Sequence, residues 1–332
     1  MLKFLGLRAI RYAVMIFGVT TLSYLMAVSF FDPALQMVEA SSGAEIDPEI
    51  SYQRVQETLA RLKLDPDQNA LERYGVWIRD VVTAWDWGRT PNGGRVNDEF
   101  GTRLWISTQL TLAATVLTFV IGVALGVFSA ARQYRLGDRL TTGYSYLTMV
   151  LPTPVAFLLV QRLAIWFNEA TGTTTFYVAG FRSVGVDGFW NQALDMAAHY
   201  AVPTFAMTVF GWAGMQISQR QYLLDFVNSD FVRTARATGL TRNQAILRHA
   251  LRVSFIPTAQ SLAYTIPALF TGTVFAEVVF NWDGLGSWSM RALISQDVNA
   301  TVAMTAYGCV IFAIGALLAD VFTSIVDPRV RL

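Results

Sequence analysis

Few side chains in this sequence are of the types that perform chemistry. There is one cysteine, Cys309, and the two histidines, His199 and His249, lie far apart in the sequence. The sequence therefore offers no disulfide within the chain and no cysteine or histidine cluster with the spacing of a metal site. The two lysines, Lys3 and Lys63, stand outside any G-x-x-x-x-G-K-[ST] motif for nucleotide phosphates. We expect no enzyme active site here, and any ATPase that the protein uses must be another chain.

The stretch of residues 219–252 is dense in arginine and contains no lysine. Its pattern predicts a helix over residues 231–238, a turn at Gly239, and a second helix for which Thr241 and Gln244 form a capping box. Apolar residues give the stretch one hydrophobic side, formed by Ala235, Ala237, Leu240, Ala245, Ile246 and Leu247. Amphipathic hairpins of this kind dock into grooves of partner proteins. We favour such docking over binding to anionic lipid headgroups alone.

Long uncharged stretches recur through the remaining sequence. Six of them contain no Asp, Glu, Lys or Arg: residues 12–31, 104–131, 140–161, 196–219, 253–276 and 298–319. A helix needs about 20 mostly apolar residues to cross a bilayer, whereas a helix of a soluble protein carries a charged face. With 53% hydrophobic and 15% charged residues, the chain is predicted to be an all-α membrane protein with six transmembrane helices.

The charges between these stretches predict the orientation of the chain. Basic residues gather before the first stretch, in alternate loops and after the last stretch, so the net charge of +1 is a cancellation between two faces. By the positive-inside rule, both termini and the loop 219–252 are cytoplasmic. The predicted organisation is residues 1–31 as the N-terminus and first helix, 32–103 as an external cap segment, and 104–332 as a five-helix core.

The external segment is expected to contain helices of its own. Residues 51–64 are typical of a short helix. A second helical face is formed by Leu71, Tyr74, Ile78, Val81 and Trp85. Trp85 and Trp87 suit anchors at the level of the lipid headgroups.

Two features inside the spans concern helix packing. Gly122 and Gly126 are spaced G-x-x-x-G, which lets helices approach closely. This contact lies either within the chain or between two chains. Pro152 and Pro154 are expected to kink the third span or to start its regular part.

Five residues in or beside the spans are candidates for the path of a transported solute: Gln161, Arg162, Tyr264, Thr271 and Glu277. A charged residue inside a span marks a functional site by default. Arg162 equally suits snorkelling to the outer interface, and for Glu277 we slightly favour a structural role as the cap of the loop 280–286. A secondary transporter would carry several carboxylates at mid-membrane or an inverted repeat, and the sequence shows neither.

The sequence resembles the inner-membrane permease subunits of ABC importers for dipeptides, oligopeptides and nickel, in particular the first permease of the pair. The resemblance covers nearly the whole chain. It rests on Phe31-Asp32-Pro33-Ala34, Asp86-Trp87-Gly88, the run 231–240, Arg248-His249-Ala250-Leu251-Arg252, the run 272–286 and the closing residues 327–332. It implies the fold of a type I ABC importer permease, with an insertion between the first two helices.

The resemblance also implies which residues couple transport to ATP. The arginine-rich run occupies the place of the EAA loop, whose coupling helix docks into an ATPase. The residues concerned are Phe231, Arg233, Thr234, Ala235, Arg236, Ala237, Gly239 and Leu240. Arg233-Thr234-Ala235 stands where the general consensus has Glu-Ala-Ala, a departure that is common in the peptide and nickel branch.

The implied function is to form half of a translocation path for peptides in the bacterial inner membrane. The implied partners are a homologous second permease, two ATPase subunits that bind ATP and Mg, an extracytoplasmic substrate-binding protein, and the lipid bilayer. No nucleic acid, metal or cofactor is expected on this chain. The alternatives are a nickel or heme permease of the same family, and two histidines are few for a nickel path.

Overall fold

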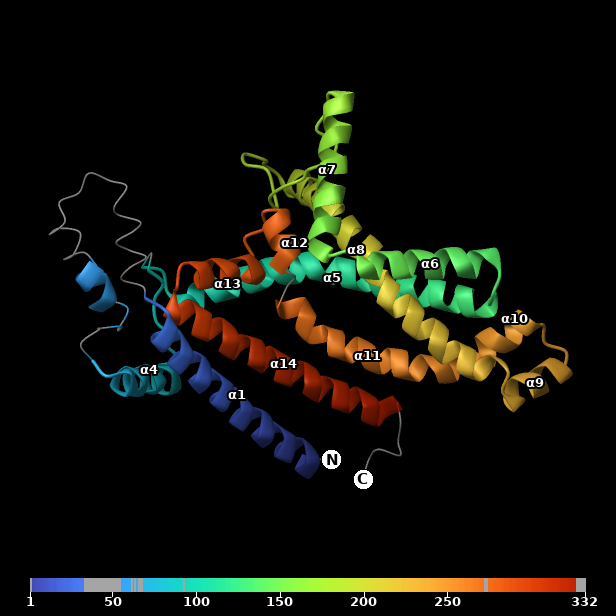
Figure 1. The fold of residues 1–332 in the computed structure, drawn as a ribbon, viewed down its shortest axis with the longest axis horizontal. Coiled ribbons are helices and arrows are strands. Elements are labelled where there is room, and N and C mark those ends of the chain that lie inside the picture. Colours follow the sequence, from blue (N-terminus) through green and yellow to red (C-terminus); the bar gives the residue numbers. More distant parts are fainter. Residues whose placement is uncertain are drawn as a thin grey trace. The chain divides into compact units, whose positions relative to one another are not determined.

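The computed structural model describes residues 2–32, 55–60, 62, 64, 68–91, 93–271 and 274–326, and only the main chain of residues 2–5, 262–271 and 319–326. Within these residues the regular elements are helices (Figure 1). Residues 55–60, within the short helix predicted over 51–64, are helical. The other helices are α1 Leu2–Phe30, α4 Ala70–Ala84, α5 Val96–Ala131, α6 Leu136–Val150, α7 Thr153–Thr171, α8 Phe189–Val227, α9 Asp230–Ala237, α10 Arg242–Ala245, the π-helical turn η1 Ile246–Ala250, α11 Leu251–Thr271, α12 Val274–Val279, α13 Leu285–Ile294 and α14 Val298–Val326.

Three of these helices are long and apolar enough to cross a membrane. The spans lie in α1 (Gly6–Phe30), α5 (Val96–Ala131) and α14 (Val298–Leu318). The pair α6 and α7 provides a fourth if it counts as one span. The chain is therefore all-helical in its described part, and a total of six transmembrane helices stays a prediction.

The third predicted span, residues 140–161, is not one straight helix. α6 and α7 are bent by 107° at the break between them. Pro152 is the N-cap of α7, and Pro154 lies in the first turn of that helix. Proline is tolerated in a first turn, where its missing N–H has no helical partner, but it breaks a helix interior. The second of our two expectations for these prolines, that they start a regular helix, is therefore confirmed.

The chain divides into two compact units, which we describe separately. The first comprises residues 1–107 and 283–317, and the second comprises residues 108–282 and 318–332. In the first unit, α1 and α14 run side by side (Figure 1), and the Ser23 hydroxyl donates to that of Thr305 over 3.2 Å. The described part of the cap segment packs on these two helices through one hydrophobic core, so the cap shares its core with α1 and α14.

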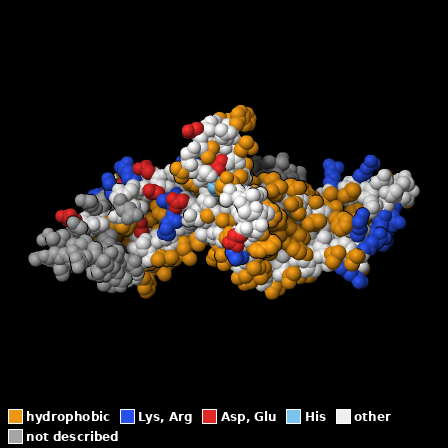
Figure 2. Space-filling view, turned by 90° about the horizontal axis from the view of Figure 1, so that it is seen from above, with side chains coloured by type: hydrophobic (Ala, Val, Ile, Leu, Met, Phe, Trp, Pro, Cys, Tyr) orange, Lys and Arg blue, Asp and Glu red, His pale blue; other side chains and the backbone are white. Residues whose placement is uncertain are grey.

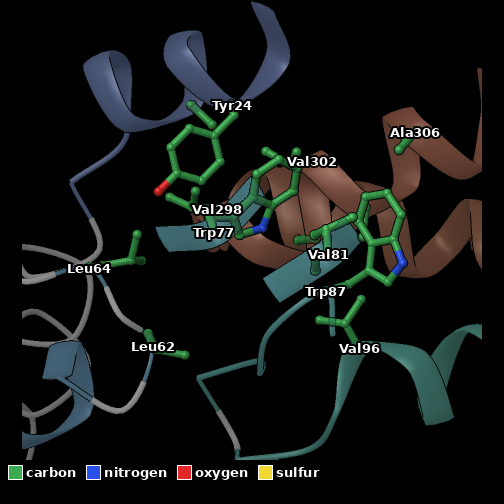
Figure 3. Close-up of a cluster of buried hydrophobic side chains, with 14 of the residues drawn as sticks. Tyr24, Leu62, Leu64, Trp77, Val81, Trp87, Val96, Val298, Val302 and Ala306 are labelled. Atoms are coloured by element: carbon green, nitrogen blue, oxygen red, sulfur yellow. The ribbon is translucent and has the colours of Figure 1, made fainter. Parts of the chain in front are cut away.

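Aromatic rings form the centre of this core (Figure 3). Trp77 of α4 lies 4.8 Å from Tyr24 of α1 between ring centroids, and Trp87 lies 5.0 Å from Tyr307 of α14. Trp87 is 4% exposed, so the prediction that it anchors the chain at lipid headgroups is wrong. Trp77 takes part in the buried face of α4, whereas Leu71, which we placed on that face, is exposed.

Asn299, in the first turn of α14, connects this helix to the cap segment by hydrogen bonds. Its side-chain amide donates to the carbonyls of Leu62, over 3.3 Å, and Arg89, over 3.0 Å. Gly88 lies directly against this amide with φ of 94°, and a Cβ atom there would come within 2.8 Å of Asn299. The glycine of the Asp86-Trp87-Gly88 motif is thus required by both its backbone angle and its neighbour.

Asp297 precedes α14, just outside the span in that helix. Its carboxylate accepts a hydrogen bond from the Ala300 N–H over 3.0 Å. Burial raises its pKa to about 6, above the model-peptide value of 3.8. Between about pH 4 and pH 6 the folded chain keeps a proton that the unfolded chain has lost, so stability falls as the pH rises through this window.

Asp297→Asn is therefore expected to stabilise the protein at pH 7.5, by about 2 kcal/mol, because it keeps an acceptor for the Ala300 N–H and removes the buried charge. The gain should vanish near pH 4, where the aspartate is protonated. The measurement is the thermal unfolding midpoint at both pH values, with Asp98→Asn on exposed surface as the control. Equal midpoints for Asp297→Asn and the unaltered protein at pH 7.5 would contradict this account.

In the second unit, α8 is the central helix and packs against α6, α7 and α11. The G-x-x-x-G row of α5 also lies on α8. A Cβ atom on Gly122 would come within 2.7 Å of the Met215 side chain, and one on Gly126 within 2.8 Å of the Gln216 carbonyl oxygen. Of the two alternatives for the G-x-x-x-G contact, the structure therefore supports packing within the chain.

Gly126→Ala is expected to destabilise the protein by about 1–3 kcal/mol, because the added methyl group meets main-chain atoms that cannot move aside easily. Gly214→Ala is the matched control, because it lies on α8 with open space around its Cα. Thermal unfolding of the purified protein measures both variants. A Gly126→Ala variant as stable as Gly214→Ala would show that α5 and α8 are not packed as closely as described.

Candidate coupling surface and the loop before α8

The arginine-rich stretch folds as the predicted hairpin of two short helical segments. α9 ends before Gly239, which has φ of +99°, a conformation that residues with a side chain rarely adopt. The Thr241 hydroxyl accepts from the Gln244 N–H over 3.4 Å, and the Gln244 side chain accepts from the Thr241 N–H over 3.0 Å. The predicted capping box is therefore confirmed, and η1 joins the hairpin to α11.

The hairpin is held to the helical bundle by its apolar side. Ala235, Ala245 and Ile246 are buried in one cluster with Ala130 of α5 and Leu223 of α8. Our expectation that this side faces a partner is therefore wrong for these three residues. Their hydrophobic pattern reflects burial, and the helices that they pack against, α5 and α8, belong to the same chain.

A hydrogen bond adds to this attachment. Arg242 donates from Nη1 to the carbonyl oxygen of Ala131 over 3.2 Å. Ala131 is the last residue of α5, so the guanidinium also meets the negative end of the helix dipole. Together the apolar cluster and this bond fix the hairpin to the ends of α5 and α8.

The opposite side of the hairpin is exposed and basic. Figure 2 shows Lys and Arg side chains gathered at the right-hand end of the molecule, where Figure 1 places α9 and α10. The exposed arginines between residues 228 and 252 are Arg233, Arg236, Arg248 and Arg252, together with Arg242, whose guanidinium reaches back to Ala131. Asp230 is the only acid between residues 228 and 252, and Arg233 approaches it at 3.5 Å. This side therefore presents a strongly positive surface on a rigid support.

The residues expected to couple to an ATPase divide between the two sides. Six are exposed: Phe231, Arg233, Thr234, Arg236, Ala237 and Gly239. Ala235 is buried, and Leu240 is half-buried beside the same cluster. The six exposed residues thus remain accessible around α9 and the turn that follows it, while the other two hold the hairpin in place.

A buried ion pair connects α6 to α8. It lies towards the end of α8 that we predict to face the cytoplasm. Arg220 donates from Nε to one oxygen of Asp138 over 2.6 Å and from Nη2 to the other over 2.9 Å. The Tyr134 N–H and the Thr142 hydroxyl also donate to this carboxylate. The Asp138 side chain is 4% exposed. The sequence reasoning missed Asp138, although an acid among arginines at residues 132–139 was a visible signal.

Two buried glutamines of α8 connect it to its neighbours. Gln216 accepts from the Ser145 hydroxyl of α6 over 2.7 Å and donates to Ser129 of α5 over 3.1 Å. Gln219, one turn further along, contacts Ser254 and Thr258 of α11. These hydrogen bonds hold α8 to α5, α6 and α11, because leaving a buried polar group without its partner is costly.

The candidates for a solute path do not form one cluster in the described structure. Gln161 donates from Nε2 to the carbonyls of Val178, over 3.1 Å, and Val279, over 2.7 Å, so it binds α7 to the following loop and to α12. Glu277 is fully buried on α12. Arg162 is exposed and approaches Glu169 at 3.7 Å. The side chains of Tyr264 and Thr271 lie outside the described residues.

The loop between α7 and α8 is held in place by several hydrogen bonds. The Gly180 N–H donates to the carbonyl of Phe280 over 2.9 Å. Ser183 donates its N–H and its hydroxyl to Asp195, each over 2.7 Å, and these bonds hold the pKa of that carboxyl below its usual value. This loop therefore has a defined shape beside α12.

Comparison with known proteins places this geometry in a family. Residues 122–332 match the family described as binding-protein-dependent transport system inner membrane component. The chain belongs to this family. Over 333 residues, covering 100% of both chains, it is 35% identical to the oligopeptide transport system permease protein OppB of Mycobacterium tuberculosis.

Two further relatives carry related names. The oligopeptide transport system permease protein AppB of Bacillus subtilis is 28% identical, with 95% of this chain and 94% of the relative covered. The dipeptide transport system permease protein DppB of Escherichia coli is 26% identical, with 70% and 73% covered. The resemblance drawn from the sequence is thus confirmed, and this chain is a multi-pass membrane component of a transport system.

Proposed function

We propose that this chain is the permease subunit of an ATP-driven importer and forms half of a translocation path for peptides. Similarity to a named oligopeptide permease over the full length of both chains carries this proposal. The described structure adds a rigidly held, exposed and basic hairpin. Such a surface suits docking of a second protein, because charged rims steer association and buried arginines contribute strongly to interfaces.

In this proposal six helical spans cross the membrane: α1, α5, the bent pair α6–α7, α8, α11 and α14. Both termini and the hairpin are cytoplasmic, and the cap is external. A homologous permease completes the path, a substrate-binding protein delivers the solute outside, and two ATPase subunits that bind ATP and Mg dock inside.

Nucleotide acts through the hairpin. Closure of the two ATPase subunits on ATP moves α9 and α10, and the bundle changes from inward-facing to outward-facing. This shift requires that nucleotide binds the two conformations with different affinities. The buried contacts of Gln216 and Gln219 support the transmission, because they join α8 to α5, α6 and α11.

Uptake by the reconstituted complex tests the substrate. Labelled dipeptides, tetrapeptides and octapeptides, nickel and heme are supplied with the binding protein and ATP. We expect peptide uptake that depends on ATP. Uptake confined to nickel or heme would contradict the peptide assignment, while loss of all uptake with intact ATP hydrolysis would contradict the transport function.

A further inference from the structure

Helix α4 of the cap is apolar over more of its circumference than its core contacts use. Trp77 and Val81 point into the core, where they are 6% and 7% exposed (Figure 3). Beside them, a second stripe of apolar side chains is exposed: Leu71 at 67%, Val82 at 74% and Trp85 at 57%. Leu71 and Val82 share one helical side because they are spaced by 11 residues, close to three turns of 3.6, and Trp85 is the residue directly after the end of α4.

The depth of α4 along α1 can be read from two contacts. The Tyr74 and Thr21 hydroxyl groups lie 2.8 Å apart, and the Trp77 and Tyr24 rings are 4.8 Å apart. With a rise of 1.5 Å per residue, these contacts lie about 9–14 Å before the end of α1 at Phe30. The span Gly6–Phe30 of α1 exceeds the roughly 30 Å of hydrocarbon. The excess is about 8 Å, so these contacts, and α4 with them, lie within roughly the outermost 10 Å of the hydrocarbon, just below the headgroups.

The face of α1 that carries α4 continues as an apolar surface. Ile10 and Phe17 precede Tyr24 by fourteen and seven residues, so all three lie on one side of the helix. Ile10 is 65% exposed and Phe17 57%, whereas Tyr24 under α4 is 1% exposed. α4 thus covers only one end of an apolar face whose remainder has the character of a lipid-facing surface.

The far side of α4 is polar. Glu72 and Arg79 are both exposed there, and the Arg79 guanidinium contacts Asp80 at 3.2 Å. Beside a membrane-spanning helix, a helix with one charged side and one unburied apolar side suits the plane of the membrane surface, with Trp at the boundary. We propose that α4 lies in the outer surface of the bilayer and inserts Leu71, Val82 and Trp85 among the lipids. That α4 lies on the outer and not the cytoplasmic side rests on the orientation given in the proposed function.

Fluorescence quenching in the whole complex tests this placement. In a Cys309→Ser background, Val82→Cys is labelled with bimane, and the complex is reconstituted in phosphatidylcholine vesicles. The quenchers are phosphatidylcholine spin-labelled at acyl carbon 5 and aqueous iodide. Glu72→Cys on the polar side is the matched control. We expect the probe at Val82 to lose fluorescence with the labelled lipid and to resist iodide, and the probe at Glu72 to behave in the opposite way.

Two results would overturn the proposal. If iodide quenches the Val82 probe as much as the Glu72 probe, this side of α4 faces water. If neither quencher reaches the Val82 probe, a protein subunit covers the stripe. Peptide uptake by the labelled complex is recorded in the same vesicles, so a failure of the transport function is distinguished from a failure of this placement.

Discussion

The double substitution Arg233→Glu and Arg236→Glu is expected to abolish ATP-driven uptake while the permease still folds. Both side chains are exposed on α9, and the buried contacts of the hairpin come from other residues. Reversing two interface charges costs about 2–5 kcal/mol for each buried pair that is lost. The ATPase subunits should therefore dissociate, and ATP hydrolysis stimulated by peptide and binding protein should disappear.

Arg139→Glu is the matched control for charge. Arg139 is exposed on α6, outside the hairpin. We expect this variant to keep most of the ATPase subunits and most of the uptake. Normal co-purification and stimulation with the double variant would show that the basic side of the hairpin does not bind the ATPase. An equal loss with Arg139→Glu would show that general charge, and not this surface, is responsible.

Asp138→Ala is expected to have the second large effect, a destabilisation of about 3 kcal/mol. The substitution leaves Arg220 without the two hydrogen bonds that it makes to the carboxylate, while its side chain remains only 19% exposed. An unpaired charge at such a site is costly because water does not replace the lost partner. The thermal unfolding midpoint of the purified permease complex measures the loss.

Two further variants separate the ion pair from other effects. Asp138→Leu combined with Arg220→Met should recover much of the stability, because it removes both charges together. Asp230→Ala should change little, because the Asp230 side chain is 98% exposed and its pair with Arg233 is weak. If Asp138→Ala is no more destabilising than Asp230→Ala, the pair does not hold α6 to α8.

Local signals in the sequence predicted the hairpin correctly. A turn glycine and a capping box act through neighbouring residues, so Gly239, Thr241 and Gln244 could be interpreted without knowledge of the fold. These local signals do not predict what the apolar side of the hairpin packs against. Periodicity shows that Ala235 and Ile246 are buried, but it does not distinguish a partner from the chain's own helices.

Contacts between distant residues account for the remaining differences. The burial of Trp87 and the need for glycine at position 88 depend on Tyr307 and Asn299, more than 200 positions away. An acid among the arginines of residues 132–139 is visible in the sequence, but its pairing with Arg220, 82 positions away, depends on the fold. The break before α7 could be predicted in part, because Pro152 and Pro154 mark its position but do not give the angle between α6 and α7.

Photochemical cross-linking from the hairpin tests the central claim most directly. A benzoylphenylalanine residue replaces Ala237, which is exposed on α9, and the same residue replaces Leu71 on α4 as the control. The intact transporter is illuminated and the adducts are identified by mass. The account predicts an adduct with an ATPase subunit from position 237 and none from position 71. A complex that retains its ATPase subunits but forms no such adduct from position 237 would contradict it.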